Sequence, residues 1–213
     1  SRVSGMKTAL IISSFVSASR VGATASAFCL RRLGVETAVL PTTLFGRHPG
    51  WGAPGGMKTP PALLRDMWDG IKAQNLHFDA VMTGYMGDID HVHLAAEIIA
   101  HIKAANPAAH VLVDPVMGDH GRLYIGEDVA GAIKAKLIPL ADTITPNVWE
   151  LEYLTAGENT QSINGAQAAA KQLPCSAIVT SVEDGGQIGA LLNNNGESLY
   201  IYHPYQTSSK MLF

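Results

Sequence analysis

Cysteine and charge are both scarce in this sequence of 213 residues. Cys29 and Cys175 are its two cysteines and no Cys-x-x-Cys spacing occurs, so we expect a reducing, cytoplasmic compartment in which both thiols pack as small apolar side chains. Charged residues make up 15% of the chain and the net charge is −3, which leaves no basic field to attract nucleic acid or an anionic membrane. No apolar run approaches the roughly 20 residues of a membrane span, so no membrane association is expected.

The sequence does contain short apolar runs that alternate with helical stretches. Strands are expected at residues 8–13, 36–40, 80–83, 110–114 and 177–180, with a short strand that begins at Thr143 and breaks at Pro146. Helices are expected at 23–33, at 60–74 behind a Thr59 cap, at 91–105 behind an Asp90 cap, and at 128–136, 147–155 and 166–173. Two more strands, 187–192 and 197–202, flank the turn signal Asn193-Asn194-Asn195-Gly196. The pattern predicts a single α/β domain over residues 1–213, with a mostly parallel central sheet, helices on both faces and an antiparallel hairpin at one edge.

Two carboxylates follow strands of this predicted sheet. Asp114 ends an apolar run, and Glu150 lies in the helix that begins at Asn147, just beyond the next strand. Ligands of open α/β sheets bind outside the carboxyl ends of the strands, so both side chains are expected to face one crevice. Each could also be structural, Asp114 as a turn residue before proline and Glu150 as a complement to the helix dipole. Because Mg²⁺ favours one or two carboxylates plus water and phosphate oxygens, the pair predicts a hydrated Mg²⁺ that carries phosphates.

Other polar residues give weaker signals. Thr180 and Ser181 end an apolar run, and their hydroxyls suit either phosphate binding or a turn at the end of a strand. The glycines beyond them do not form a GxGxxG dinucleotide loop, because a strand rather than a helix comes next. Asp88, Asp90, His91 and His93 look like metal ligands, but the two histidines are two residues apart and do not share a face of a helix. We therefore interpret this group as caps and exposed polar residues.

The stretch from Pro41 to Met57 is rich in glycine and proline. It is too long for an ordinary connection, so we predict a functional loop. Phe45 and Trp51 lie in it, and Tyr85 follows a predicted strand. Aromatic side chains in such places suit stacking against a flat ring, although packing in the core is the simpler interpretation.

Several short motifs occur in a fixed order along the chain. They are Thr83-Gly84-Tyr85-Met86-Gly87 (TGYxG), Asp114-Pro115-Val116-Met117-Gly118-Asp119 (DPVxGD), Thr145-Pro146-Asn147 with Glu150 and Glu152 (TPNxxExE), and the later hydroxyl pair Thr180-Ser181. In combination and order they resemble the pyridoxal kinases of the ribokinase-like superfamily, over nearly all of residues 7–203. The opening motif SxVxxGxVG is matched only in part, by Ser14, Val21 and Gly22, with Ala23 where the family usually has Asn and Ser19 where it usually has Gly.

This resemblance implies a role for particular residues. The pyridine ring of the substrate, a form of vitamin B6, would be surrounded by Ser14, Thr43, Phe45, His48 and Tyr85. Pro49 stands where some relatives have Thr. Asp114 and Glu150 would organise Mg²⁺ and the triphosphate of ATP. The ATP phosphates would also be contacted by Asn147, Thr180 and Ser181. Thr145 would help to hold a monovalent cation, K⁺ or Na⁺. The loop after Gly118 would form a flap over ATP.

The resemblance also indicates a missing part. The family continues beyond the hairpin to a GTGD stretch, whose aspartate is the general base for the vitamin's hydroxyl and whose backbone N–H groups form an anion hole. No GTGD occurs here, so the catalytic base is left unassigned, and the sequence ends Ser208-Ser209-Lys210-Met211-Leu212-Phe213. Because Met211-Leu212-Phe213 resembles the residues that come directly after GTGD in relatives, we expect either a fragment or the loss of a segment before Met211.

The function implied by the resemblance is ATP-dependent phosphorylation of the hydroxymethyl group of pyridoxal, pyridoxine or pyridoxamine, in vitamin B6 salvage. Such a kinase would be a cytoplasmic homodimer that uses Mg²⁺ and binds neither nucleic acid nor membrane. Two alternatives stay open. One is a hydroxymethylpyrimidine kinase of the same superfamily, and the other is a ligand-binding relative that has lost catalysis.

Overall fold

The computed structural model describes residues 6–157 and 159–204, so the expectations placed on residues 205–213 lie outside the described residues. A mixed sheet of nine strands forms within the described part, in the order β11-β10-β9-β8-β5-β4-β1-β2-β3. Its strands are β1 (Thr8–Val16), β2 (Glu36–Phe45), β3 (Gly56–Lys58), β4 (Ala80–Thr83), β5 (His110–Val113), β8 (Thr143–Ile144), β9 (Ser176–Asp184), β10 (Gln187–Asn194) and β11 (Glu197–Pro204). A separate short hairpin pairs β6 (Gly118–Asp119) with β7 (Arg122–Leu123).

The helices of the described residues follow the predicted alternation. They are α1 (Ala23–Arg32), α2 (Pro61–Lys72), α3 (Ile89–Ala105), α4 (Glu127–Ala132), α5 (Val148–Thr155) and α6 (Ile163–Ala170), with short 3₁₀ or π turns at Pro49–Trp51, Ile133–Leu137 and Ile138–Leu140. The six strands from β2 through β9 in the sheet pair in parallel, whereas β10 and β11 at one edge and β3 at the other pair antiparallel. The predicted α/β architecture with an antiparallel hairpin at one edge is therefore confirmed.

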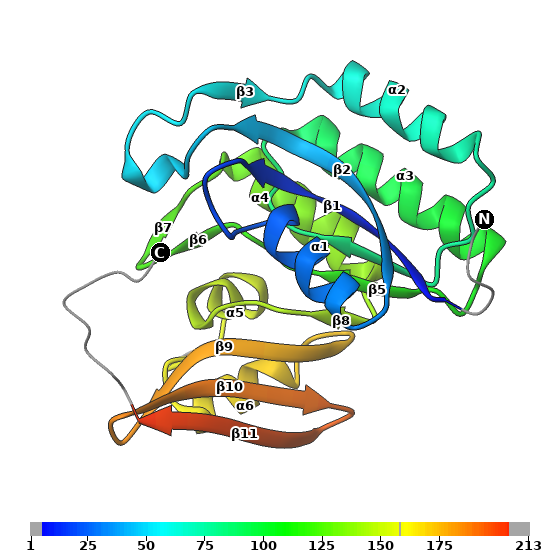
Figure 1. The fold of residues 1–213 in the computed structure, drawn as a ribbon. Helices are drawn as coiled ribbons and strands as arrows, with labels where there is room; N and C mark the ends of the chain where they lie inside the picture. Colours follow the sequence, from blue (N-terminus) through cyan, green and yellow to red (C-terminus); the bar gives the residue numbers. More distant parts are fainter. Residues whose placement is uncertain (1–5, 158, 205–213) are drawn as a thin grey trace.

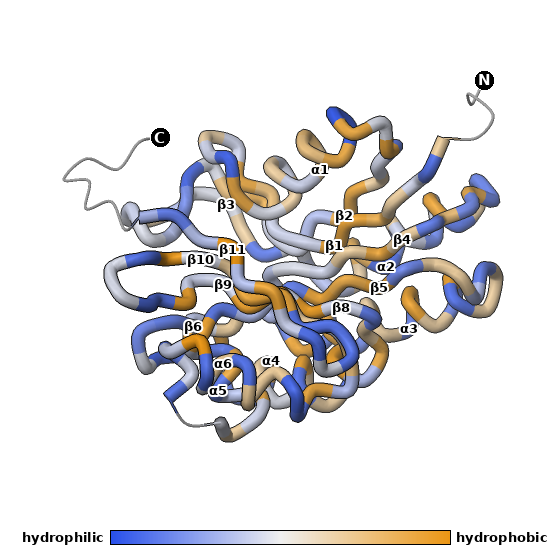
Figure 2. The backbone as a smooth tube through the Cα atoms, turned by 90° about the horizontal axis from the view of Figure 1, so that it is seen from below, coloured by the Kyte–Doolittle hydropathy of each residue, from blue (hydrophilic) through white to orange (hydrophobic). Residues whose placement is uncertain are grey.

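Helices cover the two faces of the sheet unequally. In Figure 1, α1 lies in front of β1 and β2, while α3 and α4 lie behind the sheet; Figure 2 shows the same division from below, with the apolar segments gathered in the central strands. On the α1 side a small cluster forms around Ile11, Ala23 and Ala27. On the other side one large core combines residues of β1 and β2, such as Leu10 and Leu40, with residues of α2 through α6. The expected helices on both faces are present, but only α1 covers the first face among the described residues.

The face of the sheet that α1 covers only in part carries further apolar side chains. Ile11 on the α1 side pairs in register with Met82, which pairs with Leu112, so these residues share one face of the sheet. At the far edge Leu199 and Ile201 of β11 are 56% and 65% exposed. Sheets with mostly parallel strands are normally covered on both faces, so this face suits a further packing partner.

Several predicted boundaries are wrong for identifiable reasons. β2 continues through Phe45 and β3 begins at Gly56, so the proposed loop from Pro41 to Met57 shortens to residues 46–55. Thr59 does not cap α2, because its hydroxyl donates to the Pro41 carbonyl at 2.6 Å and α2 begins behind Pro60.

The cap of α3 was also expected at the wrong residue. It is Asp88, whose Oδ1 accepts a hydrogen bond from the Asp90 backbone N–H at 2.9 Å. No helix in the described part of the chain combines the length and the hydropathy that a membrane crossing requires.

Candidate active site

A cavity of about 710 Å³ opens where β1, β4 and β5 end. Its lining comes from five parts of the chain. They are the end of β1 with the turn into α1 and its first residues, the end of β2 with the segment after it, the end of β4 with the segment after it, the loop after β5, and the end of the β6–β7 hairpin. The lining residues include Ser13, Ser14, Val16, Val21, Gly22, Phe45, His48, Tyr85, Asp114, Val116, Arg122, Leu123 and Tyr124. The cavity therefore lies at the carboxyl ends of the strands, where ligands of open α/β sheets bind.

Four of the five residues expected around the vitamin ring line this cavity. They are Ser14, Phe45, His48 and Tyr85. The fifth, Thr43, is completely buried and is not among the lining residues, and its hydroxyl has no hydrogen-bond partner within the described residues. The expected set is thus brought together apart from Thr43.

The segment after β2 has a defined local structure. The Phe45 carbonyl accepts a hydrogen bond from the Ser17 N–H at 2.9 Å, which fixes this end of β2 beside the end of β1. His48 then caps the short helix Pro49–Trp51, with its Nδ1 accepting from the Gly50 N–H at 3.1 Å. The His48 and Trp51 rings pack together with their centroids 5.5 Å apart. These contacts hold His48 at the wall of the cavity.

The turn before α1 depends on a glycine. Gly22 precedes α1 with a φ of 56°, and a side chain there would collide with both Ser14 Oγ and the Ser14 carbonyl. The partial match of Ser14, Val21 and Gly22 to the opening motif therefore corresponds to one packed turn at the cavity wall.

Asp114 lies directly after β5. Its backbone N–H donates to the Thr83 carbonyl at 3.0 Å, and its own carbonyl accepts from the Val116 N–H at 2.9 Å. Burial raises the pKa of the Asp114 carboxyl to about 6, while a hydrogen bond from the Thr145 side chain opposes this rise. The carboxyl is thus partly withdrawn from water at the edge of the cavity, with Thr145 as its polar partner.

Glu150 is only 4% exposed and is surrounded by backbone donors. Its Oε1 accepts from the N–H groups of Met117 at 2.8 Å and Gly118 at 3.4 Å, and its Oε2 accepts from the Asn147 N–H at 2.9 Å. The Asn147 side chain accepts in return from the Glu150 N–H at 2.8 Å, which completes a capping box at the start of α5. Burial raises the pKa of Glu150 to about 7 against the effect of these donors, and Asp114 adds to the rise.

The two carboxylates therefore differ in how they are bonded. Glu150 ties the loop after β5 to the start of α5, whereas Asp114 keeps capacity for a ligand. The described residues contain no group of three His, Cys, Asp or Glu side chains that could hold a metal. A Mg²⁺ ion that keeps its waters and takes phosphate oxygens needs only one or two carboxylates, so the residues present fit that ion.

The residues expected around the phosphates come from two neighbouring segments. The Thr180 N–H donates to the Pro146 carbonyl at 2.9 Å, and Asn147 and Thr180 form an isolated parallel bridge. Thr180 and Ser181 are both exposed, and Ser181 has a φ of 61°, an uncommon value for a residue other than glycine. The Asn147 amide already donates to the Gly118 carbonyl at 2.9 Å, so a phosphate contact would use its second hydrogen.

The β6–β7 hairpin is the part of the site that sequence reasoning placed least well. It was expected only as a flap loop after Gly118, yet its residues Arg122, Leu123 and Tyr124 line the cavity. The turn is made by His120 and Gly121, both with positive φ, at 50° and 80°. The one local indication of this hairpin in the sequence is the pair His120-Gly121, which suits a two-residue turn. A His-Gly pair indicates such a turn less strongly than Asn-Gly does.

The residues that resembled a metal site are used elsewhere. His91 is buried and its Nε2 lies 2.7 Å from the Thr59 carbonyl. His93 lies 3.8 Å from Asp90 on the exposed side of α3. Asp90 and His93 are exposed polar residues, as interpreted, but the interpretation is wrong for His91, which is buried, and the cap is Asp88 rather than Asp90.

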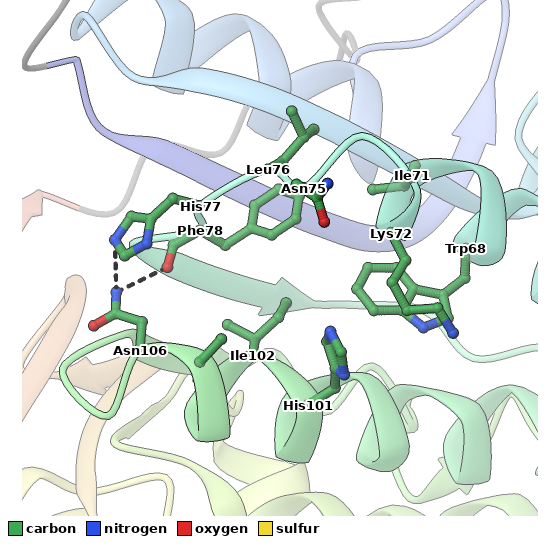
Figure 3. Close-up of a pocket in the computed structure, with 11 residues that line it drawn as sticks. Trp68, Ile71, Lys72, Asn75, Leu76, His77, Phe78, His101, Ile102 and Asn106 are labelled. Atoms are coloured by element: carbon green, nitrogen blue, oxygen red, sulfur yellow. Dashed lines mark hydrogen bonds between the residues drawn. The ribbon is translucent and has the colours of Figure 1, made fainter.

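A second cavity, of about 330 Å³, lies between α2, the segment after it, and α3 (Figure 3). Asn106 joins its sides by bonds to His77 Nε2 at 3.2 Å and to the Phe78 carbonyl at 2.9 Å. The rings of Trp68 and His101 meet edge to face. These residues lie beside the amino ends of β4 and β5, away from Asp114, so we assign them to the packing of α2 against α3.

Comparison with known proteins agrees with this geometry. The family model described as phosphomethylpyrimidine kinase matches residues 32–199. The chain belongs to this family. Its relatives include pyridoxal kinase PdxY of Corynebacterium diphtheriae, which is 37% identical over 179 residues, or 81% of this chain and 63% of that protein.

Solved structures extend the likeness to the fold. Pyridoxal kinase from Entamoeba histolytica superposes with a TM-score of 0.86 at 28% identity, over 96% of this chain and 76% of that one. Pyridoxal kinase from Leishmania donovani in complex with ADP and pyridoxine gives a TM-score of 0.83 at 28% identity, over 93% and 72%. The resemblance to pyridoxal kinases is confirmed, and this member of the phosphomethylpyrimidine kinase family spans 63% of the length of the Corynebacterium relative.

Proposed function

We propose that this chain supplies the vitamin-binding and nucleotide-binding residues of an ATP-dependent kinase that phosphorylates the hydroxymethyl group of pyridoxal, pyridoxine or pyridoxamine in vitamin B6 salvage. The observation that supports this most directly is the cavity that joins Phe45, His48 and Tyr85 to Asp114. A flat aromatic ligand fits between such side chains, and a phosphate-carrying Mg²⁺ fits beside the carboxylate. The relative from Leishmania donovani binds ADP and pyridoxine.

The polar groups of the cavity suit a substituted pyridine ring. His48 Nδ1 accepts a hydrogen bond from the Gly50 N–H, so a neutral His48 carries its hydrogen on Nε2. That hydrogen can be donated to an oxygen substituent of the ring. The Ser14 hydroxyl, at the end of β1, can donate or accept a second bond.

The phosphate end of the proposed site uses residues that follow β5 and β8 and two residues from within β9. Asp114, with Glu150 behind it, would hold Mg²⁺, which neutralises phosphate charge when it is bound. Asn147, Thr180 and Ser181 would donate hydrogen bonds to the phosphates of ATP. Phosphoryl transfer depends mainly on positioning and charge neutralisation, which these groups would provide.

We also propose that the general base lies in a further segment. The family resemblance assigns the base to the aspartate of a GTGD stretch, and the sequence contains no GTGD. Asp114 is a poor substitute, because a carboxylate that binds Mg²⁺ accepts protons weakly. A single ribokinase-like domain that binds both ligands but lacks this segment would therefore transfer phosphate slowly or not at all.

Two lesser parts of the proposal concern the cation and the assembly. Thr145, bonded to Asp114, would help to hold K⁺ or Na⁺. A cytoplasmic homodimer is supported by the apolar side chains on the α1 side of the sheet, including Leu199 and Ile201.

One alternative substrate has a specific observation in its favour. The matching family model is described as phosphomethylpyrimidine kinase, so hydroxymethylpyrimidine is a candidate for the same cavity. A catalytically inactive ligand-binding relative is the other alternative. Equilibrium titration of the 213-residue chain with pyridoxine, hydroxymethylpyrimidine and a non-hydrolysable Mg·ATP analogue separates these candidates.

We expect pyridoxine to bind more tightly than hydroxymethylpyrimidine, and the nucleotide analogue to bind only with Mg²⁺. Preference for the pyrimidine would establish the first alternative. Vitamin binding without nucleotide binding would favour the inactive relative. Phosphorylation assays on the chain as it stands, and on a version extended through a GTGD segment, then test the proposed position of the base, and activity without the extension would contradict it.

A further inference from the structure

We propose that Arg122 contacts the phosphoryl group that is transferred, both on the nucleotide and on the phosphorylated vitamer. This inference rests on the proposed function and adds a residue that the sequence motifs did not suggest. Arg122 begins β7 and lines the cavity together with Asp114 and Tyr85. Among the described lining residues it is the one lysine or arginine.

The base of the hairpin is fixed to the phosphate end of the site. The Gly118 N–H donates to Glu150 Oε1 at 3.4 Å, and the Gly118 carbonyl accepts from the Asn147 amide at 2.9 Å. Gly118 pairs with Leu123 across the hairpin, and the Tyr124 N–H donates to the Met117 carbonyl at 2.7 Å. Arg122 therefore lies on a short hairpin whose base is hydrogen-bonded to Asn147 and Glu150, at the phosphate end of the proposed site.

The guanidinium group is not used by a neighbouring acid. Asp119 is the cross-strand partner of Arg122, but its Oδ1 accepts from the His120 N–H at 2.8 Å and its Oδ2 lies 3.5 Å from His120 Nε2. Within residues 6–157 and 159–204, the hydrogen bonds and ion pairs of side chains include none from Arg122. A cation that lines a cavity without a protein partner is available to an anionic ligand.

The charge of Arg122 also acts on Tyr124, two residues along the chain, which lines the same cavity. Burial raises the pKa of the Tyr124 phenol, Asp119 adds to this rise, and Arg122 opposes it. Arg122 thus acts electrostatically on a group that also lines the cavity. An arginine offers a planar set of donors that matches two phosphate oxygens at once, and it adds a positive charge that the tyrosine hydroxyls of the cavity lack.

The test compares ligands that differ only in a phosphate. Pyridoxine and pyridoxine 5′-phosphate lack an aldehyde, so neither reacts with lysine, and both can be titrated into the 213-residue chain and its variants. For Arg122→Ala we expect affinity for pyridoxine 5′-phosphate to fall about tenfold or more, as for a lost charge-assisted hydrogen bond, while affinity for pyridoxine stays within about twofold. Arg122→Lys should lie between, because it keeps the charge and loses the paired donors.

The matched control is Arg32→Ala. Arg32 is exposed in the last turn of α1, does not line this cavity, and its replacement makes the same change in net charge. We expect it to leave both affinities unchanged. Circular dichroism of every variant checks that the fold is kept.

Each outcome decides the inference. Equal losses for the two ligands in Arg122→Ala, no loss for either, or the same phosphate-specific loss in Arg32→Ala would overturn it. A wild-type chain that binds pyridoxine but not pyridoxine 5′-phosphate also overturns the inference, although the proposed vitamin-binding cavity would still stand. A wild-type chain that binds neither ligand contradicts the proposed function itself.

Discussion

Two regions of the candidate site are built in different ways. The carboxylate region, which comprises Asp114, Thr145, Asn147 and Glu150, lies beyond parallel strands and is connected by hydrogen bonds from backbone to side chain. The loop region, which comprises residues 45–50 and 122–124, lies beside short antiparallel pairings and contains exposed residues such as Arg122 and Tyr124.

The difference separates two tasks. We propose that the carboxylate region holds a metal and phosphates. Such groups need fixed positions, and the capping box with the three N–H donors to Glu150 provides them. Groups that admit a ligand and then enclose it need to move, and loops on a rigid scaffold allow this. The comparison therefore predicts that changes in the carboxylate region alter chemistry and stability, while changes in the loop region alter ligand contact and exchange.

The largest effect is expected from Asp114→Asn. Loss of the free carboxylate should weaken binding of a non-hydrolysable Mg·ATP analogue by about a hundredfold or more, because the ion loses a charged ligand. Binding of pyridoxine should change by no more than about threefold, because the ring is held by other groups. Isothermal titration of both ligands makes the measurement, and equal losses would remove the distinction between the two regions.

Glu150→Gln should act mainly on stability. The amide cannot accept on both sides, so at least one of the Met117, Gly118 and Asn147 N–H groups loses its partner, at a cost of about 1–3 kcal/mol in the free energy of unfolding. Urea denaturation at pH 8 measures it. The control is Glu127→Gln, an exposed carboxylate in the first turn of α4, which should cost no more than about 0.5 kcal/mol. Similar losses in both variants would show that Glu150 does not brace the loop.

The pH dependence should have opposite signs for stability and for nucleotide binding. Burial raises the pKa of Asp114 to about 6 and that of Glu150 to about 7, so the folded state holds protons that the unfolded state has released. Stability without ligand should therefore fall as pH rises through this window, while Mg·ATP affinity should rise as the carboxylates ionise. Melting temperatures and titrations between about pH 5 and 8 test both signs. A melting temperature that rises over this range, or an affinity that does not, would contradict the raised pKa values.

The smallest expected effect is a change in backbone protection in two longer segments that contain most of the loop region. We expect residues 46–57 and 118–126 to exchange amide hydrogens faster without ligands than with pyridoxine and a Mg·ATP analogue. Residues 147–155, at α5, should change little, because the capping box already holds them. Hydrogen exchange read by mass spectrometry gives both numbers, and unchanged protection in the two loops would argue against a covering role.

The sequence predicted the parts of the fold that depend on local pattern. β4 spans Ala80–Thr83 as predicted, and the antiparallel hairpin forms around Asn195 and Gly196, whose positive φ values suit a two-residue turn. The ends of β1 and β2 were missed, because they are extended by pairing with each other as far as Val16 and Phe45. That pairing is a long-range contact, which no local pattern shows.

The candidate site was predictable to the same extent. Asp114 and Glu150 were found because both come after strands. The difference between them was not predictable, because it depends on N–H groups that lie 32 and 33 residues from Glu150 in the chain. The burial of Thr43 and the place of Arg122 in the cavity wall were not predictable for the same reason, because only the folded chain shows them.

One measurement tests the central claim most directly. In ¹H–¹⁵N spectra of the chain, addition of pyridoxine with a Mg·ATP analogue should shift the amide signals of His48 and Tyr85, which line the 710 Å³ cavity, and of Gly118 and Ser181 at the phosphate end. The signals of His77 and Asn106, at the second cavity, should stay in place. Shifts confined to His77 and Asn106, or no shifts at saturating ligand, would contradict the assignment of the vitamin and nucleotide site.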